Sequence, residues 1–160
     1  MRHRMLLTSL AAAIAVAALV AVSSGGAQQP DARTITLIQP DDAGSFHFID
    51  NPPRQGEEAP PLAGDMFVGS SPLFTKAGKR AGTLDFQCAV ITGGERGRIH
   101  CTGVYSLAGG TIAAQVVFPG FRPVTRIAIT GGTGAYEGAR GSIISRERRN
   151  ETVDTIRLLP

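Results

Sequence analysis

Short runs of alternating apolar and polar residues, separated by glycine, proline and other turn-forming residues, fill most of the chain after residue 30. This alternation, together with many β-branched residues, is typical of half-buried β-strands. No stretch in that part of the chain has the spacing of an apolar helical face. We expect nine strands, at 33–39, 45–50, 64–70, 82–92, 97–107, 111–118, 124–130, 140–147 and 151–159. They predict an all-β fold, and a closed barrel is favoured over a small sandwich because closure removes unpaired edges.

Residues 1–27 have a different pattern, with two arginines, an apolar run over 6–22 and small residues up to Ala27. These are the three parts of a secretory signal peptide. The apolar run approaches the length of a membrane span, but its many alanines and the small residues after it favour cleavage near Ala27 over a retained anchor. We expect a signal peptide at 1–27, one domain at 28–160, and a secreted protein without a stable membrane anchor.

The fourth and fifth of the expected strands form a predicted hairpin that carries both cysteines. If Gly94 and Glu95 form a two-residue turn, paired positions sum to 189, and Cys88 lies opposite Cys101. The same register pairs Leu84 with Tyr105, Phe86 with Gly103 and Val90 with Ile99. In an exported chain this arrangement predicts a cross-strand disulfide rather than free or catalytic thiols.

Cleavage of the signal peptide changes the charge balance. It removes two of the 16 basic residues and none of the 13 acidic ones, which leaves 14 against 13 and lowers the net charge from +3 to +1. The basic cluster from Arg146 to Arg149 includes Glu147 and is typical of a solvated strand end. With so little positive charge we expect no nucleic-acid partner.

A glycine-rich segment, "ITGGTGAYEGARG" at 129–141, is similar at first sight to a nucleotide-binding loop. A Walker-type phosphate loop ends in Gly-Lys-Ser or Gly-Lys-Thr, whereas Gly134 is followed by Ala135 and Tyr136. A dinucleotide fingerprint precedes a helix, whereas a strand pattern follows here. We therefore expect a wide turn between two strands, in which glycines take positive φ and Tyr136 packs over the turn.

The same segment closely resembles the C-terminal signature of dirigent proteins and allene oxide cyclase-like barrels. Three upstream segments are similar to the bacterial secreted branch of that superfamily: "GDMFVGSSPLF" (64–74), "AGTLDFQC" (81–88) and "AGGTIAAQVVF" (108–118). The resemblance covers the chain from about Ile35 to Leu159. It implies an eight-stranded antiparallel β-barrel, commonly a homotrimer, with a partly apolar pocket inside each barrel.

The resemblance also implies a kind of function. Plant dirigent proteins bind phenoxy radicals or quinone methides and direct their coupling or ring closure, and allene oxide cyclases steer the cyclisation of an unstable fatty-acid epoxide. Neither uses a metal or an organic cofactor. By this resemblance the chain would bind an apolar, oxygenated small molecule and guide its stereoselective coupling or cyclisation without a cofactor. The acid, asparagine and serine-proline signature of the plant epoxide cyclase is not recognisable here.

Two charged residues match positions near the pocket of that superfamily. Arg140 lies in the Ala-Arg-Gly part of the glycine-rich signature, and Asp50 ends an early strand where the family keeps an acidic group. The resemblance gives Asp50 the catalytic role of general acid or anion stabiliser, and gives Arg140 that of an oxyanion or carboxylate contact. A structural ion pair between them, or two separate surface charges, explains the same residues equally well.

The strand pattern around Asp50 gives candidates for ligand binding. Phe46 and Phe48 lie on the same strand face as Asp50 and would line the same side of the sheet. Tyr105 and Gln115 are weaker pocket candidates on later strands. The proline-rich segment 51–64 predicts a loop over the barrel mouth.

No motif indicates metal or nucleophile chemistry. His47 and His100 have no ligand at metal spacing, so both are expected to be ordinary strand residues, and no Gly-x-Ser-x-Gly elbow is present. The sequence leaves two function classes open. One is a cofactor-free cyclase or coupling guide, and the other is a barrel that binds a small molecule or an envelope partner without turnover.

Overall fold

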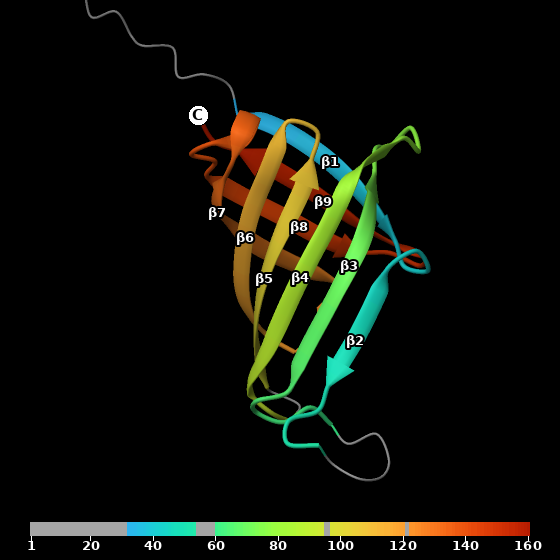
Figure 1. Ribbon diagram of the computed structural model, residues 1–160, viewed down its shortest axis with the longest axis vertical. Coiled ribbons are helices and arrows are strands. Elements are labelled where there is room, and N and C mark those ends of the chain that lie inside the picture. Colours follow the sequence, from blue (N-terminus) through green and yellow to red (C-terminus); the bar gives the residue numbers. More distant parts are fainter. Residues whose placement is uncertain (1–31, 54–59, 95–96, 121) are drawn as a thin grey trace, which may run out of the picture.

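The computed structural model describes residues 32–53, 60–94, 97–120 and 122–160, and the expected signal peptide at 1–27 lies outside these ranges (Figure 1). The described chain is all-β, with one short 3₁₀ helix. The strands are β1 (Arg33–Pro40), β2 (Ser45–Ile49), β3 (Met66–Phe74), β4 (Arg80–Thr92), β5 (Arg98–Leu107), β6 (Gly110–Pro119), β7 (Val124–Gly132), β8 (Gly141–Glu147) and β9 (Glu151–Leu158). Within these ranges no helix is long and apolar enough to cross a membrane.

The strands form one antiparallel sheet that closes on itself. Their order is β1-β9-β8-β7-β6-β5-β4-β3-β2, and a pairing of Ile38 with Phe74 joins β1 to β3. This pairing closes eight strands into a barrel and leaves β2 as an extra strand. The predicted all-β fold and eight-stranded antiparallel barrel are confirmed.

The extra strand exists because β1 and β2 use different parts of the same edge of β3. β1 pairs with β9 along its whole length and reaches β3 only at Phe74, whereas β2 pairs with β3 from Met66 to Ser70. In Figure 1, β1, β8 and β9 cross behind β3 to β6 in the half near the C-terminus, and β2 extends the sheet beyond them. We call the half with the C-terminus the closed end and the half with β2 the open end.

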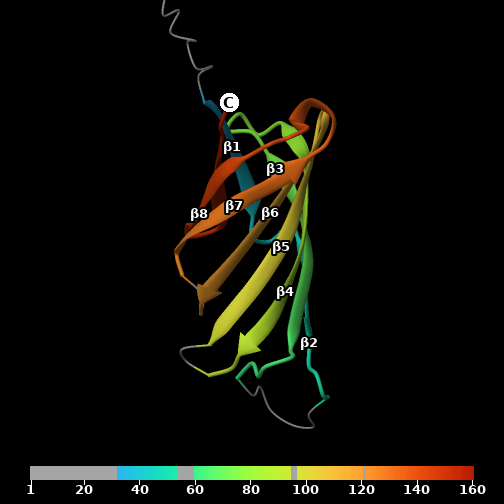
Figure 2. The same cartoon turned by 90° about the vertical axis from the view of Figure 1, so that its left-hand side faces the viewer.

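The barrel wall is incomplete between β6 and β7. These strands pair only where Ile112 to Gln115 of β6 meets Ala128 to Gly132 of β7, with an irregularity in the register. Beyond Gln115, β6 continues toward the open end while β7 turns away, so that β4, β5 and β6 extend past β7 and β8 (Figure 2). We call this gap the β6–β7 seam.

Two apolar clusters fill the interior. The closed end holds the larger one, which combines inward-facing residues of most strands: Leu37, Leu73, Leu84, Tyr105, Ile112, Ala114, Ile129, Tyr136, Ile143 and Ile156. The second cluster lies on the sheet of the open end and contains Phe67, Cys88, Val90 and Ile99. Burial of these residues removes apolar surface from water and provides the main stabilisation of the fold.

The glycine-rich segment forms a structural turn at the closed end. It contains the 3₁₀ helix η1 (Gly134–Tyr136), whose Tyr136 is only 7% exposed and joins the core. The amide of Ala135 donates to the carbonyl of Gly109 over 2.8 Å. Gly134 has a φ of +60°, and a Cβ there would collide with the Gly109 carbonyl, so both conformation and close approach require glycine. The predicted turn and the packing of Tyr136 are confirmed.

The β4–β5 hairpin has the predicted register, and Cys88 and Cys101 form the predicted disulfide with their Cα atoms 4.0 Å apart. The simple two-residue turn is wrong, because the register shifts after Val90 and Thr92 pairs with Arg98. The amide of Arg98 donates to the Thr92 hydroxyl oxygen over 2.9 Å, which stabilises this longer connection. Glu95 of the expected turn lies outside the described ranges.

Loss of the disulfide should lower the free energy of unfolding by about 2–3 kcal/mol, because it frees a short loop in the unfolded chain. Chemical denaturation of the Cys88→Ala/Cys101→Ala variant measures the effect. Dithiothreitol should destabilise the wild-type protein by a similar amount and leave the variant unchanged. An equal response of both proteins to the reductant would contradict a stabilising disulfide.

Candidate functional site

A cavity of about 210 Å³ lies inside the barrel, between β4, β5 and β6 on one side and β7 and β8 on the other. It is bounded by residues of both apolar clusters, including Tyr105 of the closed end and Cys88 of the open end. Val116 and Phe118 of β6, and Thr125 and Ile127 of β7, border it on the two sides of the β6–β7 seam. The seam therefore gives this interior cavity a side wall without a hydrogen-bonded ladder.

Small residues in one row of the sheet create space for the cavity. Phe86 pairs with Gly69 on one side and with Gly103 on the other, and Gly103 pairs with Ala114. A Cβ at Gly103 would lie 3.2 Å from the Leu84 side chain, on the interior face. Because larger side chains in this row would fill the interior, the two glycines and the alanine keep it open.

The two walls of the interior cavity differ in chemistry. The wall of β4, β5 and β6 is mainly apolar and presents Phe86, Val116, Phe118 and the Cys88–Cys101 disulfide. The wall of β7 and β8 adds polar groups from Thr125, Ser145 and Glu147. A ligand inside can therefore bury a ring or chain on one side and form hydrogen bonds on the other.

A buried carboxyl group lies behind the polar wall. Asp154 of β9 pairs with Ser145 in the ladder and is 0% exposed. Its Oδ2 atom accepts hydrogen bonds from the Tyr105 hydroxyl over 2.8 Å and from the Gln39 amide nitrogen over 2.6 Å. These bonds join β1, β5 and β9 across the interior, and they place the Tyr105 hydroxyl between the acid and the cavity region.

Burial controls the protonation of this group. Removal from water raises the pKa of Asp154, while hydrogen bonds from Ser145, Tyr105 and Gln39 oppose the shift. Burial, together with the nearby Asp154, raises the pKa of Tyr105 well above its ordinary value, so its phenol stays neutral. The Oδ1 atom of Asp154 is buried and has no hydrogen-bond partner among the described residues. The hydrogen bonds from Tyr105 and Gln39 both reach Oδ2.

The predicted aromatic residues lie at the open end of the same interior face. Phe46 stacks on Phe67 with ring centroids 5.5 Å apart, and Phe48 contacts the same ring at 5.1 Å. Phe46 also lies 6.5 Å from Phe86, which lines the cavity. Phe46 and Phe48 remain 57% and 43% exposed, so they extend the apolar wall toward solvent.

The other two predicted ligand-binding residues border the interior cavity directly. Tyr105 is buried at its closed-end side. Gln115 lies at the last pair of the β6–β7 ladder, where its exposed side chain alternates with the inward Ala114 and Val116 and also borders the outer groove. Their contact with a ligand stays a prediction.

The expected partnership of Asp50 and Arg140 does not form. Asp50 follows β2 at the open end, whereas Arg140 precedes β8 at the closed end and donates to the carbonyl oxygen of Pro160 (Figure 1). The two motifs are separated because β2 continues along β3 away from the end that holds the glycine-rich turn. Neither residue lines the interior cavity. The structure therefore places the two residues at opposite ends of the barrel, and a catalytic role for either one stays a prediction.

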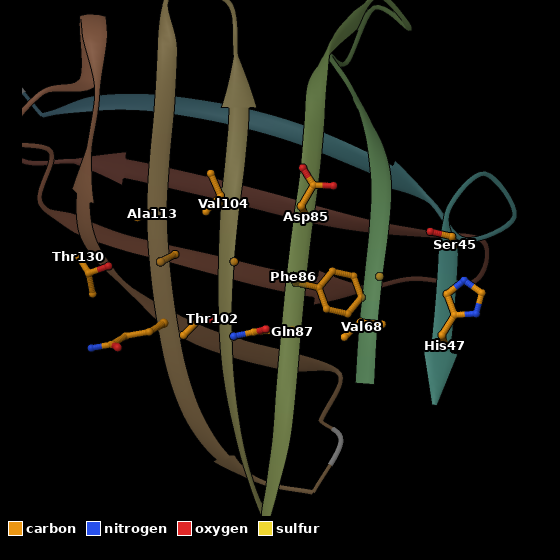
Figure 3. A pocket seen from close by; sticks show the side chains of 14 residues that line it. Ser45, His47, Val68, Asp85, Phe86, Gln87, Thr102, Val104, Ala113 and Thr130 are labelled. Atoms are coloured by element: carbon orange, nitrogen blue, oxygen red, sulfur yellow. The ribbon is translucent and has the colours of Figure 1, made fainter. Parts of the chain in front are cut away.

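A second depression lies on the outer face of β2 to β6. Figure 3 shows its lining, in which Asp85, Gln87, Thr102 and Val104 lie on the sheet together with His47 of β2. It is larger, about 690 Å³, but it is a shallow surface groove. Water is not excluded from such a groove, so polar groups there act in a high dielectric. The interior cavity, with its buried acid, is the better candidate site.

The sequence did not reveal the polar residues of the interior, namely Gln39, Ser145, Glu147 and Asp154. One signal was present: Asp154 is a carboxylate in the middle of a β-branched strand pattern. The alternation of that strand was ambiguous, because Val153 on the outer face is as apolar as Ile156 on the inner face. Among the described residues no three His, Cys, Asp or Glu side chains gather in a way that could hold a metal ion.

Several solved structures share this barrel. Pyocyanin demethylase has 24% identity and a TM-score of 0.64, over 78% of this chain and 99% of its own. AbnU, an exo-specific intermolecular Diels-Alderase, has 13% identity and a TM-score of 0.56, over 80% and 98%. The Diels-Alderase AbmU from Streptomyces koyangensis has 14% identity and a TM-score of 0.59, over 79% of this chain and 63% of its own.

These likenesses show the fold, which is that of small barrels including cyclase-type proteins. No family model and no curated protein sequence matches the chain. The narrower resemblance to dirigent and allene oxide cyclase-like proteins stays a prediction.

The raised pKa of Asp154 makes the stability of the protein depend on pH. Because the folded carboxyl binds its proton more tightly than the unfolded one, its stabilising contribution is complete below the ordinary pKa of 3.8 and is lost as pH rises through the folded value. Asp154→Asn keeps an acceptor for Tyr105 and Gln39 without this loss. Its free energy of unfolding should therefore rise relative to wild type above pH 3.8.

Denaturant titrations at pH values below and above 3.8 measure the difference in the free energy of unfolding between wild type and Asp154→Asn. Asp42→Asn, on the exposed β1–β2 connection, removes the same charge and is the control. A difference between Asp154→Asn and wild type that does not change with pH would contradict the assignment.

Proposed function

We propose that this protein binds a largely apolar, oxygen-bearing small molecule in the interior cavity and guides its stereoselective coupling or cyclisation without a cofactor. The observation that carries the proposal is the two-sided interior, with an aromatic wall opposite polar groups backed by a buried acid. Such a cavity holds a ligand in one orientation, and confinement of reacting groups lowers the entropic part of the barrier.

The polar groups suit oxygen chemistry on the ligand. The Ser145 hydroxyl lines the cavity and interacts with Asp154 behind it, and the Tyr105 hydroxyl donates to the same carboxyl. Because Ser145 and Tyr105 both donate to Asp154, their hydroxyl oxygens are held in fixed orientations and can accept a hydrogen bond from a hydroxyl group of the ligand. Fixed polar groups of this kind orient the ligand before ring closure. Two proteins of the same fold, AbnU and AbmU, are Diels-Alderases, which form a ring by cycloaddition.

The cavity also sets a limit on the ligand. At about 210 Å³ it is smaller than typical pockets for drug-sized ligands, which begin at roughly 300 Å³. A ligand that fills it would extend along Phe86 toward Phe46 and Phe48 at the open end. This extension favours an elongated or ring-bearing ligand whose polar group enters first.

A second candidate is binding without turnover. It is favoured by one observation, that Asp154 lies behind the cavity wall and its carboxyl oxygens are covered. In that case the hydrogen bonds of Asp154 orient Tyr105 and hold three strands together, and the cavity stores or shields its ligand.

Export and assembly are part of the same proposal. The signal-like pattern at 1–27 supports a secreted protein, and the disulfide suits an oxidising compartment. A homotrimer is supported by the resemblance and by apolar side chains such as Val104 and Val117 on the outer face, which are 39% and 58% exposed.

Native mass spectrometry of protein from the exported fraction should detect a retained small molecule on a chain that begins near Gln28, in a trimer. Val116→Phe fills the interior cavity and should abolish retention, with a melting temperature within about 4 °C of wild type. Val117→Phe places the same ring on the outer face and should keep the ligand. Equal retention by both variants would place the ligand outside the interior.

Turnover is tested with the retained molecule or its reactive precursor. Tyr105→Phe removes one hydroxyl from the cavity boundary and should lower product stereoselectivity at least about tenfold, a change worth about 1.4 kcal/mol in the transition state. Binding of the precursor should change far less. Chiral chromatography measures the ratio of stereoisomers. An identical ratio with wild-type protein, with Tyr105→Phe and without protein would support binding alone.

A further inference from the structure

The interior cavity has a one-sided charge. Among the described residues that line it there is no lysine, arginine or histidine. Its lining does include one carboxylate, that of Glu147 at the last position of β8. Asp154 lies behind Ser145 and does not border the cavity. A bound molecule therefore meets one carboxylate, that of the exposed Glu147, and no cationic side chain among the lining residues.

Glu147 is free to contact a ligand. It follows Ile143 and Ser145 in the alternation of β8 and, like Ser145, borders the cavity. Its amide donates to the Pro123 carbonyl over 2.9 Å, which anchors the end of the strand. The neighbouring Arg148 pairs with Glu151 instead, at 3.9 Å. In the part of the chain that the structure describes, no ion pair involves Glu147.

Aromatic rings lie on the opposite side of the same space. Phe118 and Phe86 line the cavity together with Glu147, and the ring of Phe46 continues this surface toward the open end. The face of an aromatic ring attracts a cation, also where the site is partly open to solvent, as it is at the exposed Glu147. A carboxylate placed across from aromatic rings is the arrangement that recognises amines and quaternary ammonium groups. An anionic ligand would instead be repelled by Glu147 without any compensating positive side chain.

We propose that the ligand of the interior cavity carries a positively charged nitrogen, which lies between the Glu147 carboxylate and the rings of Phe118 and Phe86. This inference rests on the proposed function and specifies its ligand class. The oxygen-bearing part of the ligand then lies deeper, toward Ser145 and Tyr105. The charge fixes the orientation of the ligand, because Glu147 at the end of β8 carries the only formal charge among the described residues that line the cavity.

Two probes of the same shape test the charge directly. Phenyltrimethylammonium and tert-butylbenzene differ by one nitrogen atom and its positive charge. The chain has two tyrosines and no tryptophan, so Tyr136→Phe leaves Tyr105 at the cavity as the only strong intrinsic fluorophore. In this background, titration followed by tyrosine emission should show that the cation binds about tenfold more tightly than the neutral probe.

Glu147→Gln should reduce the affinity for phenyltrimethylammonium about fivefold or more and leave that for tert-butylbenzene unchanged. Glu137→Gln is the matched control, because it removes the same charge from an exposed residue beside η1 at the closed end. Equal losses in both variants would indicate a general field effect and overturn the proposal.

The other outcomes separate this inference from the proposed function. If tert-butylbenzene binds as tightly as the cation, or more tightly, the charge inference is overturned and small-molecule binding stands. A parallel loss of both probes in Glu147→Gln would assign the residue a structural role and also overturn it. Absence of binding by either probe would count against both the charge inference and the interior binding site.

Discussion

The hydrogen bond from Tyr105 to Asp154 crosses the interior of the barrel, and the layout of the interior depends on it. The two residues belong to β5 and β9, which are separated in the sheet by three other strands. A buried carboxyl group needs hydrogen bonds to offset its removal from water, and Tyr105 and Gln39 donate them. Apolar side chains pack on the closed-end side of this bond, and the cavity opens on the other side.

The remaining architecture follows from the two strands, β1 and β2, that pair with different parts of one edge of β3. β1 meets β3 only at the closed end, and β2 occupies the rest of that edge, so the strands that complete the barrel cover only half of the β2 to β6 sheet. The interior face of the other half is therefore built from aromatic side chains and a disulfide rather than from a second layer of strands. The closed end is therefore packed and stabilises the fold, whereas the open end leaves the interior face accessible to a ligand.

Local features of this protein could be predicted from the sequence, and features that join distant strands could not. Cys88 and Cys101 are 13 residues apart in one hairpin, so the register of an assumed turn between Gly94 and Glu95 predicted their pairing, although the observed connection is longer. Asp154 meets Tyr105 and Gln39 across 49 and 115 residues, and no pattern within a single strand contains that information. Asp50 and Arg140 were matched by resemblance one at a time, which says nothing of their separation along the barrel axis.

The β6–β7 seam gives the barrel a direction of low mechanical stiffness. Moving the end of β6 away from β7 breaks no ladder hydrogen bond beyond Gln115, whereas separating β4 from β5 would break a continuous ladder and stretch the disulfide. Beyond Gln115 this side of the interior is therefore held by the β5–β6 ladder and by the short connection at 120–123, and not by pairing between β6 and β7.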